Sequence, residues 1–221
     1  MLLAVTGLRR EARIAESECV KAISGGGDRT SLEAQLALAL QEPMQGIVSF
    51  GIAGALAPTL KPGDCVIASH VIDGETVYDC NAAWLNAVAA RMSDAQIGAI
   101  AGSQFILADI AAKEALFAKT GASAVDMESH VAARAARERA LPFLAIRTIS
   151  DAADRALPPA ALAALKPDGA LDIAGIARSL LAKPAQIPAL IRTGRESEQA
   201  FVALFRCLDL LGRLFAFPDL G

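Results

Sequence analysis

The stretch AVDMESHVAARAARERALPFLAIRTISDAAD, at residues 124–154, carries the strongest structural signals in this chain. Its pattern predicts a helix that opens with Asp126-Met127-Glu128, then a buried strand, then a loop that starts at Ser150-Asp151. Each acid thus stands at an end of a regular element, where a rigid α/β scaffold can hold a carboxylate at a fixed distance from a ligand. The alternative is that Glu128 is an ordinary first-turn helix acid and Asp151 a cap or turn residue.

Length and composition restrict the class of protein. A chain of 221 residues with 54% hydrophobic and 20% charged residues predicts a dense α/β core and little disorder. The formal charge of −3 and the pI of about 5.5 give no basic surface for nucleic acid. The N-terminal apolar run is too short for a signal peptide, and no run approaches a membrane span. We therefore expect a cytoplasmic protein that binds no nucleic acid.

The cysteines and histidines give no metal-binding pattern. No two cysteines have CxxC spacing, and the two histidines do not form an HExxH motif. We therefore expect no metal site. The cysteines are predicted to be buried reduced thiols. His130 follows Glu128 by two residues, so on a helix it is expected to point away from that acid and to be structural.

Strands and helices alternate along the chain, which predicts a single α/β sheet covered by helices on both faces. Short apolar runs predict strands at residues 2–6, 47–50, 65–72 and 97–102. Apolar residues at helical spacing predict helices at residues 8–23, 30–40, 82–92, 111–119 and 171–182. Thr30 and Glu33 are placed as a capping box, and residues 73–81 are predicted to form a loop.

A change of composition near Lys183-Pro184 predicts a main domain, residues 1–183, followed by a helical tail, residues 184–221. Within the tail, EQAFVALFRCLDLLGRLFAF at residues 198–217 is strongly apolar at helical spacing, with a thin polar stripe. This pattern predicts that the helix packs on the domain or on a second subunit.

Four separated segments together resemble the nucleoside phosphorylase and nucleosidase family. They are TGLRRE at 6–11, FGIAGALAPTLKPGD at 50–64, AGSQFI at 101–106, and VDMES with RTISDAAD at 125–129 and 147–154. The chain most resembles the methylthioadenosine/S-adenosylhomocysteine nucleosidases and the bacterial hopanoid-associated phosphorylases, whose N-terminus reads like TGLRREARIA. The resemblance implies a three-layer αβα fold with a mixed central sheet and a C-terminal helical appendage. It also implies a homodimer and no metal or organic cofactor.

The resemblance assigns roles to the acids of the opening stretch. Breaking an N-glycosidic bond requires a proton for the leaving base and support for a ribose that becomes cation-like. Asp151 would donate to the purine N7, with Ser150 orienting it. Glu128 would bind the ribose 2′- and 3′-hydroxyls, with Met127 on the sugar face and Asp126 in the same substrate-binding set.

The resemblance also assigns a base pocket. Phe105 would stack on the base, and the backbone of Ile106 would read its edge. The glycine-rich loop would let backbone amides approach the ligand, through Gly51, Ile52, Ala53 and Gly54. Taken alone, Phe105 could equally be a core aromatic and the loop a tight turn.

The segment GLRRE leaves the nucleophile open. Aligned with the nucleosidases, Glu11 would activate water; aligned with the hexameric purine phosphorylases, Arg9 would grip phosphate as a co-substrate. A third interpretation makes Arg9 a solvated helix residue. The phosphorylases carry an arginine and a serine around the glycine loop, where this chain has Ser49 and Ile52. An isoleucine side chain cannot hold an anion, so this departure favours hydrolysis.

The sequence therefore predicts an enzyme that releases adenine from a 5′-modified purine nucleoside. The hopanoid resemblance implies adenosylhopane, an adenosine joined at C5′ to a long pentacyclic lipid, as substrate. It also implies peripheral contact of the tail helix with the inner membrane. The alternatives are a methylthioadenosine/S-adenosylhomocysteine nucleosidase, a phosphate-dependent phosphorylase, and a nucleoside-binding module without activity.

Overall fold

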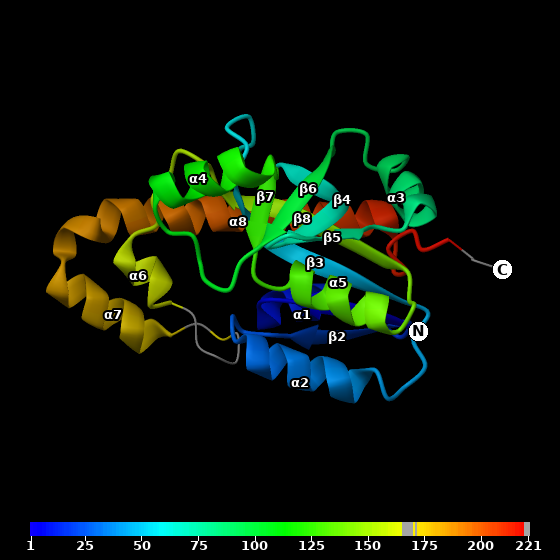
Figure 1. The fold of residues 1–221 in the computed structure, drawn as a ribbon. Helices are drawn as coiled ribbons and strands as arrows, with labels where there is room; N and C mark the ends of the chain where they lie inside the picture. Colours follow the sequence, from blue (N-terminus) through cyan, green and yellow to red (C-terminus); the bar gives the residue numbers. More distant parts are fainter. Residues whose placement is uncertain (165–169, 171, 219–221) are drawn as a thin grey trace.

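The computed structural model describes residues 1–164, 170 and 172–218. Within these ranges eight strands form one sheet, with helices on both sides of it (Figure 1). The strands are β1 (Leu2–Thr6), β2 (Val20–Ser24), β3 (Gly46–Ala55), β4 (Cys65–Asp73), β5 (Thr76–Asp79), β6 (Gln96–Gly102), β7 (Ala124–Asp126) and β8 (Phe143–Asp151). The helices are α1 (Arg9–Ala15), α2 (Arg29–Ala39), α3 (Ala82–Ala89), α4 (Ile110–Thr120), α5 (Ser129–Glu138), α6 (Pro159–Leu162), α7 (Ile173–Ala182), the 3₁₀ turn η1 (Pro184–Gln186) and α8 (Ile187–Leu211).

The sheet is mixed and partly closed on itself. Its strand order is β2-β1-β3-β7-β6-β4-β5, and β8 pairs with both β3 and β4. The strands β3, β7, β6, β4 and β8 therefore close into a ring of hydrogen-bonded neighbours. The pairs β3–β8, β4–β6 and β6–β7 are parallel, whereas β3–β7 and β4–β8 are antiparallel. The predicted α/β fold with a mixed central sheet and a C-terminal helix is confirmed.

The central strand is β8, whose residues Phe143–Asp151 are all buried. It is paired along both edges, and α8 packs against it, with the Thr148 hydroxyl donating to the Ala200 carbonyl at 3.0 Å. A strand buried on both faces reads as a nearly continuous apolar run. Arg147 is the charged exception within that run, and it lies at the centre of the candidate site.

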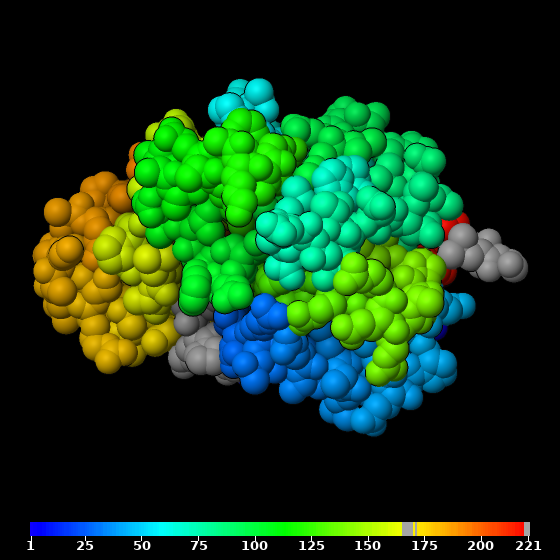
Figure 2. Space-filling model, in the orientation of Figure 1, coloured from blue at the N-terminus to red at the C-terminus, as the bar shows by residue number. Residues whose placement is uncertain are grey.

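The tail is part of the main hydrophobic core. Phe201, Leu204 and Cys207 on α8 are buried in the same cluster as the sheet residues. Farther along, the Trp84 indole donates to the Phe215 carbonyl at 2.7 Å, which ties the segment after α8 to α3. The expectation that the tail helix packs on the domain is therefore confirmed. In Figure 2, α6, α7 and the start of α8 form a yellow and orange lobe beside the main body.

Several predicted boundaries were wrong. The helix expected at 8–23 ends at Ala15, and Val20–Ser24 forms β2, because the open edge of β1 offers parallel backbone pairing. The loop expected at 73–81 contains β5, which pairs with β4 through a turn at Gly74, where φ is +62°. The predicted tail helix, 198–217, starts earlier and ends at Leu211.

Other local predictions also need correction. The helix expected to open at Asp126 starts at Ser129, because residues 124–126 form the short strand β7. The α2 helix is capped by the side chain of Asp28, and Glu33 instead contacts two arginines, so no Thr30–Glu33 capping box forms. Cys19 is exposed, contrary to the prediction of four buried thiols. Leu171, the expected start of the last domain helix, lies outside the described residues, and the helix there begins at Ile173.

Candidate active site

Arg147 occupies the middle of β8 and is completely buried. Its Nε contacts the Asp126 carboxylate at the end of β7. Its Nη2 donates to the Ser49 hydroxyl at 2.7 Å and lies 3.8 Å from Glu128 Oε2. The remaining nitrogen, Nη1, has no hydrogen-bond partner among the described residues. A buried guanidinium is strongly disfavoured unless carboxylates compensate it, and here several do.

Glu11 lies in the first turn of α1 and is almost completely buried. Its Oε2 accepts the backbone N–H groups of Gly7 and Leu8, at 2.8 and 2.7 Å. Its Oε1 accepts the N–H of Ile52 from β3, at 2.8 Å. Burial raises the pKa of Glu11, while the nearby Arg147 and the three amides oppose that rise. The carboxylate is thus held rigidly between the N-terminal loop and the end of β3.

Glu128 is the third acid near Arg147, at the N-cap position of α5. Burial and repulsion from Asp126 raise its pKa to about 8, against the attraction of Arg147. A Cβ atom at Gly7 would lie 2.8 Å from Glu128 Oε1, so only glycine permits this close approach. The loop between β1 and α1 therefore contacts two of the acids, Glu11 and Glu128.

Gly51 on β3 permits a second close approach. A Cβ atom there would lie 2.6 Å from Glu11 Oε1 and 2.7 Å from Arg147 Nη1. The Glu11 carboxylate and the Arg147 Nη1 group therefore both lie close to the Cα atom of Gly51. The residues predicted to form a loop, Gly51 to Ala55, instead belong to β3. The side chains of Glu11 and Arg147 approach its backbone closely, and the approach of this backbone to a ligand stays a prediction.

Asp151 ends β8 and faces a different cation. The Lys113 ammonium on α4 contacts Asp151 Oδ2 at 2.5 Å, and both residues are buried. The Ser150 hydroxyl lies 2.7 Å from Asp151 Oδ1 and 3.1 Å from the Ala53 carbonyl. A Cβ atom at Gly54 would lie 3.2 Å from Asp151 Oδ2. Asp151 and Ser150 are therefore adjacent, as predicted, and they lie beside the end of β3.

The end of β3 separates the two acidic positions. Glu11 binds beside Gly51 and Ile52, whereas Asp151 lies beside Gly54. Three residues of extended strand correspond to roughly 10 Å. The two carboxylates therefore lie beside successive positions along the end of β3.

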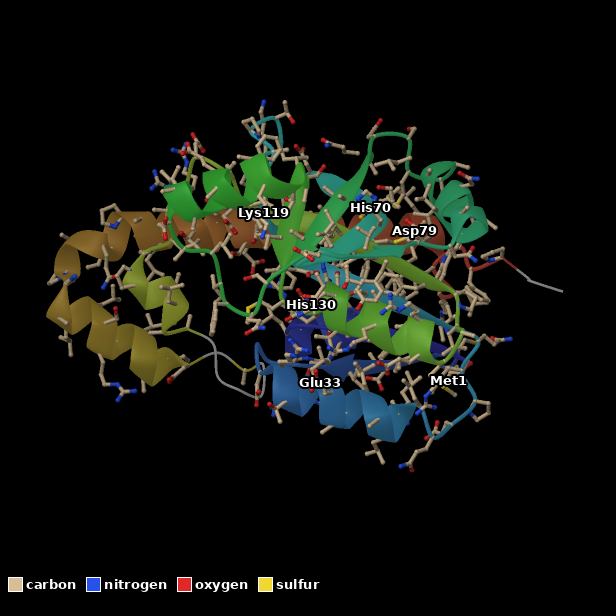
Figure 3. All side chains as sticks on the ribbon, viewed as in Figure 1. Met1, Glu33, His70, Asp79, Lys119 and His130 are labelled. Carbon is tan, nitrogen blue, oxygen red and sulfur yellow. The ribbon has the colours of Figure 1, made fainter. Side chains whose placement is uncertain are left out.

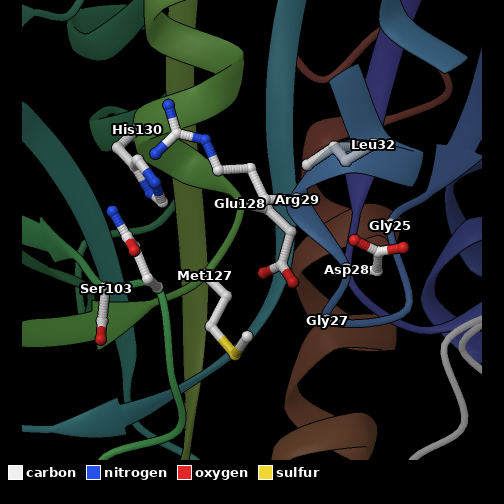
Figure 4. A pocket seen from close by; sticks show the side chains of 10 residues that line it. Gly25, Gly27, Asp28, Arg29, Leu32, Ser103, Met127, Glu128 and His130 are labelled. Atoms are coloured by element: carbon white, nitrogen blue, oxygen red, sulfur yellow. The ribbon is translucent and has the colours of Figure 1, made fainter. Parts of the chain in front are cut away.

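A small cavity lies next to Glu128 (Figure 4). Its walls come from the β2–α2 turn, the β6–α4 loop and the start of α5, through Gly25, Gly27, Asp28, Arg29, Leu32, Ser103, Gln104, Met127, Glu128 and His130. Met127 and Glu128 are therefore on one wall, as predicted. The prediction that His130 points away from Glu128 is wrong, because both side chains line this cavity. His130 is buried, its Nδ1 has no partner among the described residues, and burial lowers its pKa.

The two residues predicted to bind the base lie on the β6–α4 loop. Phe105 is 75% exposed, and Ile106 is 39% exposed. The Phe105 N–H donates to the Ser103 hydroxyl at 3.2 Å, which shapes the loop. A core position for Phe105 is thereby excluded, and a role against a ligand stays a prediction.

The structure places two other predicted residues in contrasting surroundings. Arg9 is exposed in the first turn of α1. The neighbouring Arg10 pairs with Glu198 and stacks 3.9 Å from the centre of the Phe201 ring, so it anchors α8. The carboxylate of Asp126 is occupied by Arg147 and Ser129, which makes it a support for the site. In the ranges that the structure describes, no three His, Cys, Asp or Glu side chains gather as metal ligands.

Two buried cations were missed by the sequence reasoning. Arg147 gave a signal, since a single charge within an apolar buried strand must have partners. Lys113 gave none, because a lysine in a helix such as IAAKEALFAKT normally lies on the solvated face. Only the tertiary packing of α4 against the end of β8 reveals it.

Comparison with known proteins identifies the family. Residues 25–182 match the Phosphorylase superfamily, and this match covers well over half of the chain. The chain therefore belongs to that superfamily. No match was found among curated protein sequences.

Solved structures share the fold. An S-adenosylhomocysteine nucleosidase from Streptococcus pyogenes, in complex with 5-methylthiotubericidin, aligns with a TM-score of 0.66 and 16% identity, over 96% of this chain and 97% of that chain. A putative 5′-methylthioadenosine/S-adenosylhomocysteine nucleosidase from Francisella philomiragia gives 0.68 and 13%, over 95% and 96%. Futalosine hydrolase from Helicobacter pylori gives 0.58 and 17%, over 68% and 87%. At these identities the likeness establishes the fold alone.

In the described ranges, no helix combines the length and the apolar character needed to cross a membrane.

Proposed function

We propose that this chain hydrolyses the N-glycosidic bond of a purine nucleoside with a 5′ substituent and releases adenine. The observation that carries the proposal is the placement of Glu11 and Asp151 beside successive positions along the end of β3. A water activated by Glu11 would attack C1′ and give up its proton to that carboxylate. Asp151 would donate a proton to the base as the bond from C1′ to the base nitrogen breaks.

The charge of the site suits a cation-like ribose. Glu11, Asp126 and Glu128 surround a single guanidinium, so the cluster carries more acids than cations. Positive charge that develops on the ribose ring is favoured beside such a cluster. Glu128 would accept hydrogen bonds from the two ribose hydroxyls, with Met127 against the sugar. The acids thus stabilise the charge that forms in the transition state.

Hydrolysis is favoured over phosphorolysis by the contacts of Glu11. Its carboxylate already takes the backbone N–H groups of Gly7, Leu8 and Ile52. A phosphate bound there would lose these donors and would repel the carboxylate. Water, in contrast, can accept from the free N–H of Arg147 and donate to Glu11. Arg9 is thus not needed for the reaction.

For the 5′ substituent, the resemblance to hopanoid-associated phosphorylases supports the lipid of adenosylhopane. The outer side of α8 exposes three apolar side chains that could contact a lipid, Val202, Phe205 and Leu210, beside the exposed Arg206 and Asp209. Because α8 also supplies core residues, substitutions on its outer face are a cleaner test than deletion. Phe205→Ser with Leu210→Ser should slow turnover of adenosylhopane and spare methylthioadenosine. Leu181→Ser on α7, an exposed leucine elsewhere in the lobe, is the control.

Adenine release should be measured on adenosine, methylthioadenosine and adenosylhopane, with phosphate varied. The proposal expects release without phosphate and faster turnover of at least one 5′-modified substrate. Asp151→Asn removes the proton donor and is the low-activity control. A strict phosphate requirement would show a phosphorylase. Binding without release by the wild-type protein would show a nucleoside-binding module. Sedimentation of the purified chain tests the homodimer, and fractionation of cells tests a cytoplasmic or membrane-peripheral location.

A further inference from the structure

The Lys113 side chain is buried beside Asp151 and makes every hydrogen bond that an ammonium can donate. It contacts Asp151 Oδ2, and it donates to the carbonyls of Ala152 and Arg155 at 2.9 and 3.0 Å. Its side chain is 1% exposed, and that of Asp151 is 8% exposed. A solvated helix lysine has no such fixed set of partners. The ammonium is therefore locked in one position against one oxygen of Asp151.

This ammonium also joins two walls of the base side of the site. It is carried by α4, which follows the loop of Phe105 and Ile106. Its carbonyl partners belong to the loop after β8, and the Leu157 N–H donates to the Ala108 carbonyl at 2.7 Å to complete the junction. A shift of Lys113 would move Asp151 relative to the base-binding loop.

The Ser150 hydroxyl can accommodate both protonation states of Asp151. Its hydroxyl has one hydrogen and two possible acceptors, Asp151 Oδ1 and the Ala53 carbonyl. With an ionised Asp151, the hydroxyl donates to Oδ1. With a proton on Oδ1 that is directed to the base, the hydroxyl turns its own hydrogen to the Ala53 carbonyl. Since Oδ2 faces the ammonium, a proton on Asp151 belongs on Oδ1.

We propose that Lys113 is a positioning residue that stabilises the negative charge formed on Asp151 as its proton passes to the leaving base. The proton moves from Asp151 Oδ1 to the base nitrogen while the glycosidic electron pair goes to the base. Asp151 becomes a carboxylate, and the ammonium on Oδ2 compensates it. This inference rests on the proposed function and adds a residue that acts through Asp151.

Stability alone does not require such a pair. A buried ion pair can often be replaced by apolar side chains of similar volume without loss of stability. Lys113 is also a single lysine pointing inward on a helix whose other lysine, Lys119, is exposed (Figure 3). Compensation of the charge that forms on Asp151 during proton transfer explains the buried lysine, whereas packing alone does not.

The test compares two leaving groups on one sugar. Methylthioadenosine needs a proton on its leaving base, whereas the 4-nitrophenyl glycoside of 5-methylthioribose releases 4-nitrophenolate, a stable anion that needs no proton. Lys113→Met should lower kcat on methylthioadenosine by roughly 100-fold and on the nitrophenyl riboside by less than about 3-fold. Lys119→Met on the same helix is the matched control and should leave both rates unchanged.

A double variant covers the case in which Lys113→Met does not fold. Asp151→Asn with Lys113→Met removes both charges, and it should have the same kcat as Asp151→Asn alone, because Lys113 acts only through Asp151. A further loss of 10-fold or more in the double variant would overturn the inference. So would equal loss on both substrates in Lys113→Met, or no loss on either. A wild-type protein that cleaves neither substrate would instead overturn the proposed function itself.

Discussion

The two buried cations of the site, Arg147 and Lys113, have opposite surroundings. Arg147 lies among three acids, Glu11, Asp126 and Glu128, and one of its nitrogens has no hydrogen-bond partner in the part of the chain that the structure describes. Lys113 faces the single acid Asp151, and all of its hydrogens are used. The first cluster has surplus negative charge and a free donor, while the second is balanced.

This difference separates the tasks of the two clusters. A surplus of carboxylates around one cation is stable only if some of them bind protons or a positive ligand compensates them. The Arg147 cluster is thus suited to receive a ribose and a water. A balanced pair such as Lys113–Asp151 holds a carboxyl group in place and compensates its charge when it ionises. Substitutions should therefore affect the two clusters differently.

The largest expected effect is on activity, from Glu11→Gln. The change keeps the shape of the side chain but removes the base that activates water, so kcat should fall by roughly 10²–10⁴-fold. Glu16→Gln, at the exposed C-cap of the same helix, is the matched control. Steady-state adenine release measures both. A loss below about 3-fold would mean that the Arg147 cluster does not supply the base.

The next expected effect is on stability, from Arg147→Met. The change leaves three acids without their cation and should lower the free energy of unfolding by about 3–5 kcal/mol. Lys113→Met leaves one acid, which can bind a proton, so its loss should be smaller. Urea unfolding of both variants at neutral pH makes the comparison. Equal decreases in the free energy of unfolding would show that the excess of acids around Arg147 does not affect stability.

Alanine substitutions at two glycines of β3 compare how tightly the two clusters are packed. A Cβ at Gly51 would meet Glu11 and Arg147 at 2.6 and 2.7 Å, whereas at Gly54 it would meet Asp151 at 3.2 Å. Gly51→Ala should therefore lower kcat by about 100-fold, and Gly54→Ala by less. Gly194→Ala, on α8 with nothing within 4 Å of its added Cβ, should leave kcat unchanged. A larger loss of kcat in Gly54→Ala than in Gly51→Ala would show that the space beside Asp151 is the more restricted one.

The smallest expected effect is the pH dependence of stability due to Glu128. Its pKa is raised from 4.5 to about 8, so the folded protein binds this proton more tightly than the unfolded chain. The resulting stabilisation is fully present below pH 4.5 and is lost as pH rises through 8. Glu128→Gln should remove about 1–2 kcal/mol of this loss, because part of the proton binding passes to the neighbouring Glu11, whose pKa burial also raises.

Melting temperatures from pH 5 to 9 measure the effect, at roughly 2–4 °C per kcal/mol. Glu33→Gln is the control of opposite sign. Its exposed ion pairs lower the pKa of Glu33, so their small contribution is present above pH 4.5 and is lost as pH falls through the folded pKa. An identical dependence of the melting temperature on pH in the wild type and in Glu128→Gln would contradict the raised pKa of Glu128.

The sequence allowed the acids to be predicted better than the cations. Glu11, Glu128 and Asp151 lie in short local motifs, so a resemblance over a few residues identified them. The roles of Arg147 and Lys113 depend on partners that are distant in the sequence, such as Asp126 for Arg147 and the loop after β8 for Lys113. Residue type and spacing carry no information about such distant contacts.

The fold shows the same division. The strands β1, β4, β6 and β8 were predictable because their sequences are short apolar runs bounded by turn residues. Val20–Ser24 was predicted as helix, because Val20 and Ile23 fit helical spacing and only the edge of β1 makes them a strand. The Asp73-Gly74 turn was a hairpin signal that the loop prediction overlooked.

The most direct test of the account is a product analysis with methylthioadenosine and excess phosphate. Adenine release and ³¹P NMR of the same sample report whether the sugar leaves free or as its 1-phosphate. We predict stoichiometric adenine with no sugar phosphate, because Glu11 holds the amides that a phosphate would need. Sugar 1-phosphate equal to the adenine released, or no adenine at all, would contradict the account.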